Sequence, residues 1–203
     1  MHELRLVHTD LKPENILFVN SDYYKVPEGA CPTKQKRVPS SSRIKLIDFG
    51  SATFENQYHS AIVSTRHYRA PEVILGLGWT YPCDVWSVGC ILIELLTGDA
   101  LFQTHENLEH LAIMERVLGP IPKGMSKRAD RHSSKYFLPT RELNWPAGAS
   151  SRESIRAVRC MRSLDDLLYA VCGYSPATAK LYDLLKGLLC YESEYRLTVR
   201  ITF

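Results

Sequence analysis

The sequence contains little material for a disulfide framework or a metal cluster. Six cysteines are present among 203 residues, but no two form a C-x-x-C pair, and their spacing is not that of a small disulfide-rich domain. Histidines and cysteines do not gather at the spacing of a metal site, and no internal repeat is visible. We therefore expect free thiols and a reducing compartment.

Long apolar runs and a strong charge bias are absent as well. The longest apolar run, near residues 88–96, is interrupted by Glu94 and is too short to cross a bilayer. The first residues lack the pattern of a secretory signal peptide. The formal net charge is only +3, which does not by itself indicate binding to nucleic acid. These absences predict a protein that contacts neither membranes nor nucleic acid directly.

What the sequence does contain is a core of ordinary size and a polar motif placed directly before an apolar run. With 45% hydrophobic residues, the chain can form one domain or slightly more. The motif is H-T-D-L-K-P-E-N-I-L at residues 8–17. Pro13 fixes its own φ angle and biases Lys12 away from helix, so the motif is predicted to be a loop. A short buried strand is predicted to follow at 16–19.

This loop carries an acid, a base and an amide within six residues. Asp10 can accept a proton from a hydroxyl, Lys12 can lie against a phosphate, and Asn15 can offer an oxygen to a hard cation. A second carboxylate, Asp48, follows another predicted strand at 44–47. If the two strands pair, Asp48 lies near Asn15, and their oxygens, completed by phosphate oxygens and water, suit Mg²⁺.

The order of three motifs is more specific than any one of them. H-x-D-x-K-x-x-N at 8–15 is followed by D-F-G at 48–50 and A-P-E at 70–72, which is the downstream half of the protein-kinase signature set. The alternative is that these are capping and turn residues of an unrelated α/β domain. The polar residues 51–69 lie where kinases keep the activation segment, and they include the candidate phosphosites Ser64, Thr65 and Tyr68.

Two further segments are predicted around these motifs. Residues 1–7 have the pattern of the last turns of a helix. Residues 20–43 combine several prolines, three consecutive serines and basic residues, which predicts a polar loop or exposed hairpin inserted between the two strands. This insert is either a docking or regulatory element or a solvated loop.

Residues 84–96 are predicted to form the most apolar helix, which Pro82 precedes and Gly98 ends. Apolar residues cover nearly its whole circumference, so burial on most sides is expected. Asp84 either caps this helix or binds backbone groups of the loop at 8–10, and the similarity of the three motifs to those of protein kinases favours the second role.

The last third of the chain contains further helices and a basic region. Residues 107–118 carry one apolar stripe and stop at Gly119-Pro120. Residues 120–162 are basic and turn-rich, with three arginines on one helical face, which predicts either a patch for acidic or phosphorylated partners or a solvated face. Short helices are predicted to begin at Ser163 and at Ser175-Pro176.

With these residues in view, the chain resembles the C-terminal lobe of a eukaryotic protein kinase over residues 1–198. A narrower resemblance lies in E-H-L-A-I-M-E-R-V-L-G at 109–119, which is similar to the signature of the LAMMER (Cdc-like, or CLK) kinases. Thr9, where most kinases have Arg, agrees with that group, and the resemblance favours a plant member. It implies an α+β fold, mostly helical, with a small β-hairpin region.

The LAMMER resemblance implies a dual-specificity protein kinase that uses ATP and Mg²⁺ and phosphorylates Arg/Ser-rich splicing factors, as a monomer, in the nucleus or also in the cytoplasm. Carried over by position, Asp10 would deprotonate the substrate hydroxyl and Lys12 would contact the γ-phosphate. Asn15 and Asp48 would hold Mg²⁺, and Leu17 would form the floor under adenine. In addition, Glu72 would pair with Arg196 to anchor the activation segment.

Thr9 has a consequence of its own. The arginine that other kinases have at this position pairs with a phosphorylated activation loop, and Thr9 cannot form that ion pair. We therefore predict that activity does not depend on loop phosphorylation through this residue.

The sequence departs from the kinase pattern at both ends. No Gly-rich phosphate loop, strand lysine or helix glutamate precedes the motif, and residues 199–203 do not continue into the last helix of the family. The expected organisation is a C-terminal lobe truncated at both ends over 1–203, with the insert 20–43, the basic insert 120–162 and no N-lobe. The alternative function is an inactive binding module or decoy that docks partners through helix 107–118 and the basic segment. A third outcome is a fragment that does not fold stably.

Overall fold

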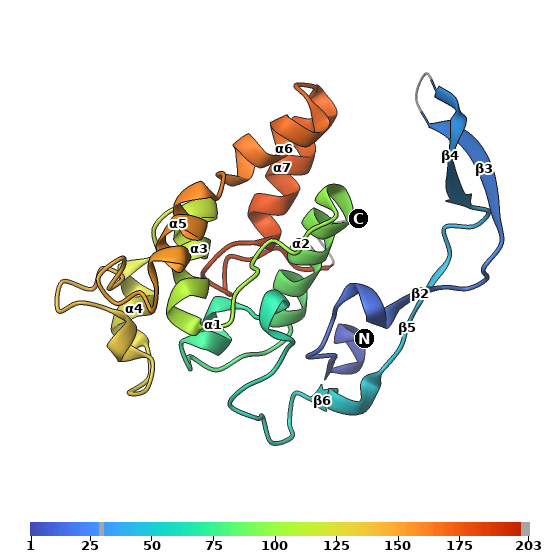
Figure 1. Ribbon diagram of the computed structural model, residues 1–203. Coiled ribbons are helices and arrows are strands. Elements are labelled where there is room, and N and C mark those ends of the chain that lie inside the picture. Colours follow the sequence, from blue (N-terminus) through green and yellow to red (C-terminus); the bar gives the residue numbers. More distant parts are fainter. Residues whose placement is uncertain (29–30, 200–203) are drawn as a thin grey trace.

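The computed structural model describes residues 1–28 and 31–199, and it consists of a helical body from which one strand pair projects (Figure 1). In the described part, seven α-helices make up most of the body. They are α1 (Pro71–Ile74), α2 (Pro82–Thr97), α3 (Asn107–Leu118), α4 (Lys123–Arg128), α5 (Arg152–Cys160), α6 (Leu164–Cys172) and α7 (Pro176–Leu188). Among these residues, no helix combines the length and apolar composition that a membrane crossing requires.

The strands form three separate antiparallel pairs, β1 with β6, β2 with β5 and β3 with β4. Their bounds are β1 (Leu6–Val7), β2 (Ile16–Phe18), β3 (Tyr23–Glu28), β4 (Cys31–Pro39), β5 (Ile44–Leu46) and β6 (Thr53–Phe54). The pairing of β2 with β5, in which Ile16 lies opposite Leu46, confirms the two strands predicted on either side of the insert. The prediction that the first strand is buried is wrong, because Leu17 and Phe18 are 46% and 55% exposed.

The amino-terminal residues do not form the helical turns that were predicted for 1–7. Only His2–Leu4 form a short 3₁₀ turn, which ends where Arg5 adopts φ 55°. Leu6 and Val7 then pair with Phe54 and Thr53 as a two-residue strand. The local sequence pattern did not predict this strand, because its pairing partner β6 lies almost fifty residues further along the chain.

Helix α2 is the central helix of the body. It begins at Pro82 and ends at Gly98, whose φ of 85° is the left-handed conformation that glycine adopts without strain. Most of its residues are buried, as predicted, although Leu95 is 71% exposed. Gly89 permits close packing on the segment after α7, because a Cβ at this position would lie 2.8 Å from Leu189.

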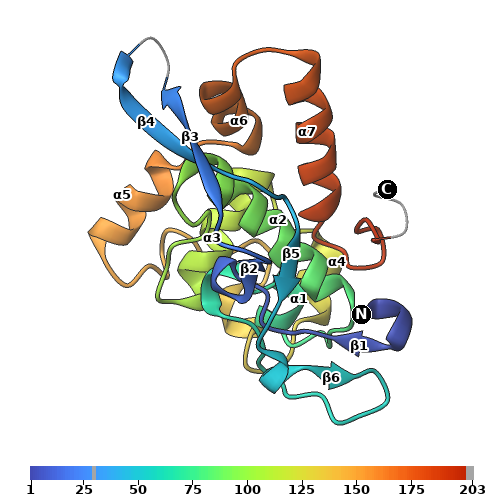
Figure 2. The same cartoon turned by 90° about the vertical axis from the view of Figure 1, so that its right-hand side faces the viewer.

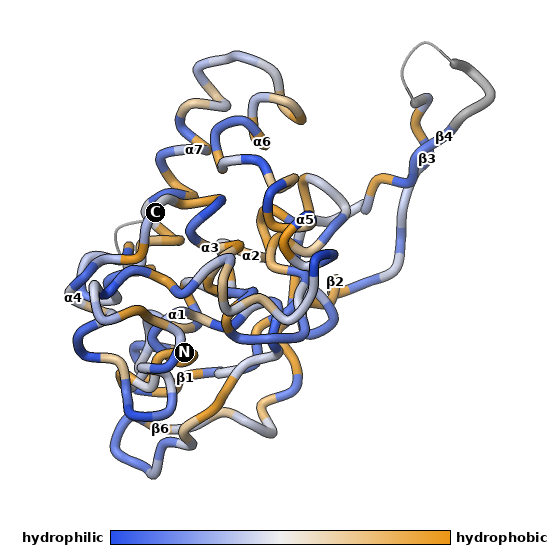
Figure 3. The backbone as a smooth tube through the Cα atoms, turned by 60° about the vertical axis from the view of Figure 1, so that its left-hand side comes forward, coloured by the Kyte–Doolittle hydropathy of each residue, from blue (hydrophilic) through white to orange (hydrophobic). Residues whose placement is uncertain are grey.

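Helix α3 has the bounds predicted for it, and its apolar stripe lies in the core. His110, Leu111 and Met114 are completely buried. The other face of the helix is partly exposed, with Arg116 in contact with solvent, so docking through this helix stays a prediction. In Figure 3 the apolar segments gather where α2 and α3 lie, inside the helical body.

Two glutamates of the LAMMER-like segment on α3 hold neighbouring parts of the chain. Glu109 accepts hydrogen bonds from Thr104 Oγ1 at 2.7 Å and from Ser154 Oγ at 2.6 Å, which ties α3 to the start of α5. Glu115 Oε1 accepts the backbone N–H of Ile121 at 3.0 Å. The segment therefore organises the basic region that follows it.

The predicted starts of the last two helices are confirmed. Helix α6 begins one residue after Ser163. At α7, the Ser175 side chain accepts the N–H of Thr178 at 3.1 Å, and Pro176 occupies the first helical position. In the basic region, the three arginines of α5 (Arg152, Arg156 and Arg159) are all exposed.

Strands β3 and β4 form a hairpin in the segment 20–43, which we call the arm. It extends away from the helical body in two perpendicular views (Figures 1 and 2), and its strands pack chiefly on one another. The arm leaves the body between β2 and β5, next to the loop at 8–15.

Candidate active site

Asp84 of α2 holds the loop that carries the predicted site. Its Oδ2 accepts the backbone N–H of His8 at 2.8 Å, and its Oδ1 accepts that of Thr9 at 2.9 Å. His2 Nε2 lies 3.1 Å from the same carboxylate, which is only 2% exposed. Asp84 makes no capping hydrogen bond at the start of α2. The favoured role of this residue, binding backbone groups of the loop, is confirmed.

The loop is fixed on its other side to the segment around Asp48. His8 Nε2 lies 3.0 Å from the carbonyl oxygen of Ile47 and therefore donates, while Nδ1 accepts the N–H of Asp10 at 3.3 Å. These two bonds suit one neutral tautomer of the imidazole. Thr9 adopts φ 68° and donates its hydroxyl to Ser51 O at 2.8 Å. Two segments forty residues apart in sequence are thus held together.

Asp10 is surrounded by hydrogen-bond donors. Its Oδ2 lies 2.8 Å from Lys12 Nζ, and its Oδ1 accepts both the backbone N–H and the hydroxyl of Thr65, at 3.0 Å and 2.7 Å. Burial works against the charged carboxylate, but the bonds from Lys12 and Thr65 outweigh it and lower the pKa of Asp10. The bond to Asp10 raises the pKa of Lys12. At neutral pH the Asp10 carboxylate is therefore ionised and can accept a hydrogen bond or a proton, and Lys12 beside it is positively charged.

Asn15 and Asp48 are brought together by the strand pairing. Ile47 donates its N–H to Asn15 O at 3.0 Å, directly beyond the last pair of β2 and β5. Asn15 is buried and donates its amide nitrogen to Asp10 O at 2.9 Å, and its side-chain oxygen has no partner among the residues that the structure describes. Asp48 follows Ile47 directly, so the same pairing places it next to the loop.

These residues fit a divalent cation as partial ligands. Asp48 adopts φ 62°, and its carboxylate has no hydrogen bond or ion pair within residues 1–28 and 31–199. The side-chain oxygen of Asn15 is the second donor. No cluster of three His, Cys, Asp or Glu side chains occurs in the described part. Two oxygens from the protein, with phosphate oxygens and water in the other positions, are a donor set that suits Mg²⁺.

Leu17 lies on β2 opposite Lys45, two residues beyond Asn15. Its side chain is nearly half exposed, on the strand that follows the loop at 8–15. An apolar side chain in this place can contact a flat ligand. The structure therefore brings Asp10, Lys12, Asn15 and Asp48 together and places Leu17 beside them.

The candidate phosphosites have different surroundings. Tyr68 is buried and donates its hydroxyl to Glu94 Oε2 at 2.7 Å, so it is not an accessible site. Burial, with that bond, raises the pKa of Tyr68. Thr65 forms hydrogen bonds to Asp10. This contact was not predicted from the sequence, which indicated Thr65 only as a candidate phosphosite and Asp10 only as a candidate base. Only the position of Thr65 in the fold reveals this contact.

The predicted pair of Glu72 and Arg196 is confirmed. Arg196 Nη1 and Nη2 bind Glu72 Oε1 and Oε2 at 2.6 Å and 2.8 Å, and both side chains are almost fully buried. The guanidinium also donates to the carbonyl oxygens of Pro82, Cys190 and Tyr191. The pair therefore connects α1, at the end of the activation segment, to the carboxyl-terminal part of the chain.

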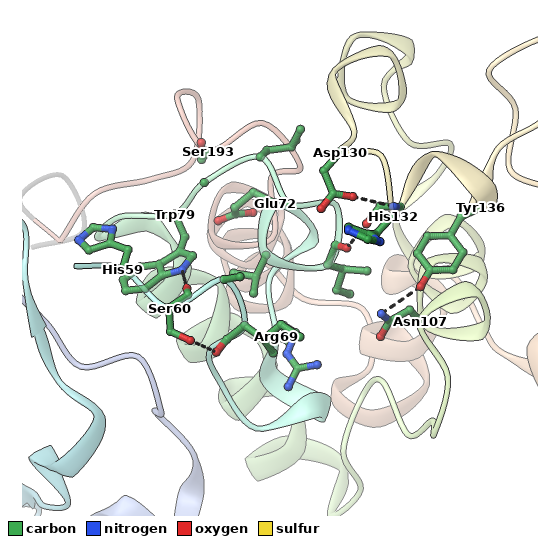
Figure 4. Close-up of a pocket in the computed structure, with 18 of the residues that line it drawn as sticks. His59, Ser60, Arg69, Glu72, Trp79, Asn107, Asp130, His132, Tyr136 and Ser193 are labelled. Carbon is green, nitrogen blue, oxygen red and sulfur yellow. Dashed lines mark hydrogen bonds between the residues drawn. The ribbon is translucent and has the colours of Figure 1, made fainter.

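A cavity of about 720 Å³ opens beside Arg69 and Glu72 (Figure 4). In it the His59 ring stacks on Trp79 with centroids 4.2 Å apart, and Trp79 Nε1 donates to Ser60 O at 2.8 Å. None of the predicted catalytic residues lines this cavity. Arg69 connects the two places, because it donates to the carbonyl oxygens of residues 63 and 64, directly before Thr65.

The comparisons with known proteins agree with this geometry. A family model for the protein kinase domain matches residues 1–202. Serine/threonine-protein kinase AFC1 of Arabidopsis thaliana is 59% identical over 207 residues, which cover 98% of this chain and 44% of that protein. Human dual specificity protein kinase CLK2 is 47% identical over 199 residues, which cover 98% of this chain and 38% of that protein.

Among solved structures, the crystal structure of the kinase domain of PF14_0431 matches with a TM-score of 0.84 and 42% identity. The match covers 97% of this chain and 57% of that one. The chain thus spans less than half the length of the two curated relatives named above.

Proposed function

This chain belongs to the protein kinase family, in its LAMMER (Cdc-like) group, and we propose that it transfers the γ-phosphate of ATP to serine, threonine and tyrosine hydroxyls of proteins. The proposal depends on one observation: Asp48, which follows β5, lies next to the loop that carries Asp10, Lys12 and Asn15. When bound, ATP and Mg²⁺ supply the transferable phosphoryl group and neutralise its charge.

Each residue contributes through position and charge. The ionised carboxylate of Asp10 orients the substrate hydroxyl and accepts its proton. Lys12 Nζ, held 2.8 Å from that carboxylate, places a positive charge where the phosphoryl group arrives. The side-chain oxygens of Asn15 and Asp48 would hold the cation, and Leu17 would lie against the adenine ring. Phosphoryl transfer requires little covalent help, so positioning and charge neutralisation by these residues are their whole contribution to catalysis.

For the substrate, we propose Arg/Ser-rich proteins such as splicing factors, with the nucleus as the location, although the cytoplasm is an alternative. The carboxylate of Glu14 supports this choice. Glu14 lies in the loop between Lys12 and Asn15, is exposed, and has no ion pair in the described part of the chain. It is therefore available to a substrate arginine close to the acceptor hydroxyl.

A transfer assay tests the proposal. The chain is assayed alone and fused to the part of AFC1 that precedes the matched region, with labelled ATP, Mg²⁺ and an Arg/Ser peptide. Asp10→Asn is expected to lower the rate about 10²–10⁴-fold. The control, Asp183→Asn, changes an exposed carboxylate on α7 and is expected to leave the rate unchanged.

The same assay separates the alternative function. Peptide binding without transfer in either form would show a non-catalytic binding module, because the catalytic residues would then be present without activity. Equal rates for Asp10→Asn and Asp183→Asn would contradict the assigned role of Asp10.

A further inference from the structure

The arm has a concentration of positive charge that the net charge of the chain conceals. The whole sequence has 25 basic and 22 acidic residues, and residues 20–43 contain five of the basic and two of the acidic ones. The arm alone therefore carries a formal charge of +3, and the rest of the chain is neutral overall. The small net charge of the whole chain predicted no direct contact with nucleic acid. The positive charge of the arm is instead favourable for binding an anionic partner at this place.

The arm also exposes aromatic rings beside its charges. Tyr23 and Tyr24 are 45% and 55% exposed and point to opposite faces of β3. The arm projects from the body in both views (Figures 1 and 2). An isolated two-stranded hairpin is only marginally stable in water, so a partner that covers one face would stabilise it.

The register of the arm places two like charges side by side. Ser40 donates its N–H to Asp22 O at 2.9 Å, which makes 22 and 40 a hydrogen-bonded pair. Pairs alternate in an antiparallel ladder, so Tyr23 with Pro39, Lys25 with Arg37 and Pro27 with Gln35 are non-hydrogen-bonded pairs. The prolines agree with this assignment, because each lacks the N–H that a bonded pair requires. Side chains lie closest in non-bonded pairs, with Cα atoms about 4.5 Å apart.

Directly opposite like charges destabilise a strand pair unless an anion lies between them. Neither Lys25 nor Arg37 forms an ion pair with any residue that the structure describes. The Arg37 guanidinium instead lies over the Tyr23 ring, 4.6 Å from its centroid. Lys25, Arg37 and Tyr23 share one face of the arm, which we call the basic face.

A hollow of about 180 Å³ adjoins this stacked pair at the base of the arm. It is lined by Tyr23 and Arg37 together with Phe18, Pro39, the polar residues Asn20 and Ser21, and the acidic residue Asp22. Next to the basic face there is thus a small site with an aromatic wall and several hydrogen-bonding groups.

The prolines also indicate how a partner binds. In the non-bonded pairs the N–H and C=O groups point outward, but Pro27 on β3 and Pro39 on β4 have no N–H to offer. Proline on an edge strand blocks the addition of another strand. A partner is therefore held by side chains of the face and not as a third strand.

We propose that the basic face of the arm binds single-stranded RNA. Lys25 and Arg37 contact successive phosphates, and a base stacks on the pair formed by Tyr23 and Arg37, with its edge toward the hollow. Every nucleotide offers both a negative charge and a flat ring, so the exposed Tyr23 ring beside Arg37 favours nucleic acid over an acidic peptide. Basic side chains alternating with aromatic ones are the usual combination for single strands.

Fluorescence anisotropy with a labelled ten-nucleotide oligouridylate tests this proposal on the 203-residue chain. Lys25→Ser/Arg37→Ser is expected to weaken binding at least tenfold and to reduce the dependence of log K on log salt by roughly 1.4, since each phosphate contact on a single strand contributes about 0.7. Tyr23→Leu is expected to weaken binding about fivefold or more through the lost stacking.

The matched control is Arg152→Ser/Arg156→Ser, which removes the same charge from exposed positions on α5. It is expected to change the affinity less than twofold. A second arm variant replaces residues 21–41 by a short Gly-Ser turn between β2 and β5, and this variant is expected to abolish RNA binding while the helical body keeps its thermal unfolding transition.

Three results would overturn the proposal: no binding of the oligouridylate, equal loss in the arm and α5 variants, or competition by a poly-glutamate peptide at equal charge with no effect of Tyr23→Leu. The last result would assign the arm to acidic proteins. Asp10→Asn is expected to bind RNA normally, so failure here is independent of the proposed kinase activity.

Discussion

The Asp84 Oδ1 atom and the backbone nitrogen of Thr9 lie 2.9 Å apart, although 75 residues separate them in sequence. Through this bond and the one to His8, the central helix α2 determines the position of the loop that ends at Asp10. A carboxylate suits this role because both of its oxygens accept, and two neighbouring N–H groups donate to it.

Asp84→Asn is expected to destabilise the loop more than the body. The amide replaces one acceptor by an N–H₂ group, so a buried backbone donor loses its partner at a cost of about 1–3 kcal/mol. Hydrogen exchange at residues 8–10 should accelerate, while exchange in α3 stays slow. Asp183→Asn is the control, and unchanged exchange at residues 8–10 in the Asp84 variant would contradict this role.

Glu72→Gln is expected to lower the free energy of unfolding by about 3–5 kcal/mol, because it leaves the fully buried charge of Arg196 without its partner. Glu72→Gln/Arg196→Met should be less unstable than the sum of its single variants, since no unpaired charge remains. Urea unfolding of the three variants measures this coupling. Strictly additive effects would show that the pair contributes nothing beyond its separate contacts.

His110 predicts a loss of stability in mild acid. Burial, with nearby Arg66, Arg69 and His67, lowers its pKa to about 3, and neither ring nitrogen has a hydrogen-bond partner in the described part. In the unfolded chain the ring has a pKa of about 6.5, so below that pH only the unfolded state takes up the proton. Stability from this group is complete above pH 6.5 and is lost progressively toward pH 3.

The measurement compares His110→Leu with the unchanged chain at pH 7.5 and 5.5. The unchanged chain should lose about 1.4 kcal/mol more than the variant between these two values. Parallel pH profiles for the two proteins would contradict a neutral buried histidine.

Thr9 predicts independence from phosphorylation of the activation segment. Its side chain is 1% exposed and donates to Ser51 O, so it is occupied within the fold and offers no charge to a phosphate. Phosphatase treatment of an active preparation should therefore leave the transfer rate unchanged. A loss of rate that Thr9→Arg amplifies would contradict this expectation.

Several parts of this fold could be predicted because the information is local. The bounds of α3 follow from its apolar period and the Gly119-Pro120 stop, and the start of α7 follows from Ser175-Pro176. The role of Asp84 and the pairing of β2 with β5 also followed from the order of the motifs. The grouping of Asn15 with Asp48 could be predicted because each residue lies at one end of the paired strands β2 and β5.

The parts that were wrong depend on distant contacts. Residues 6–7 form a strand because Thr53 and Phe54 lie opposite them, which no local pattern reveals. Leu17 and Phe18 have apolar side chains that normally predict burial, but the residues that the structure describes leave about half of each exposed. The contact of Thr65 with Asp10 arises only when the activation segment returns to the loop, so it could not be found from spacing.

The most direct test of the central claim uses Mn²⁺ as a paramagnetic substitute for Mg²⁺, together with a non-hydrolysable ATP analogue. The account predicts that NMR signals of Asn15, Asp48 and the side chain of Lys12 broaden, and that Asp48→Asn abolishes the effect. Broadening centred on another part of the molecule, or unchanged by Asp48→Asn, would contradict a common metal and nucleotide site at this loop.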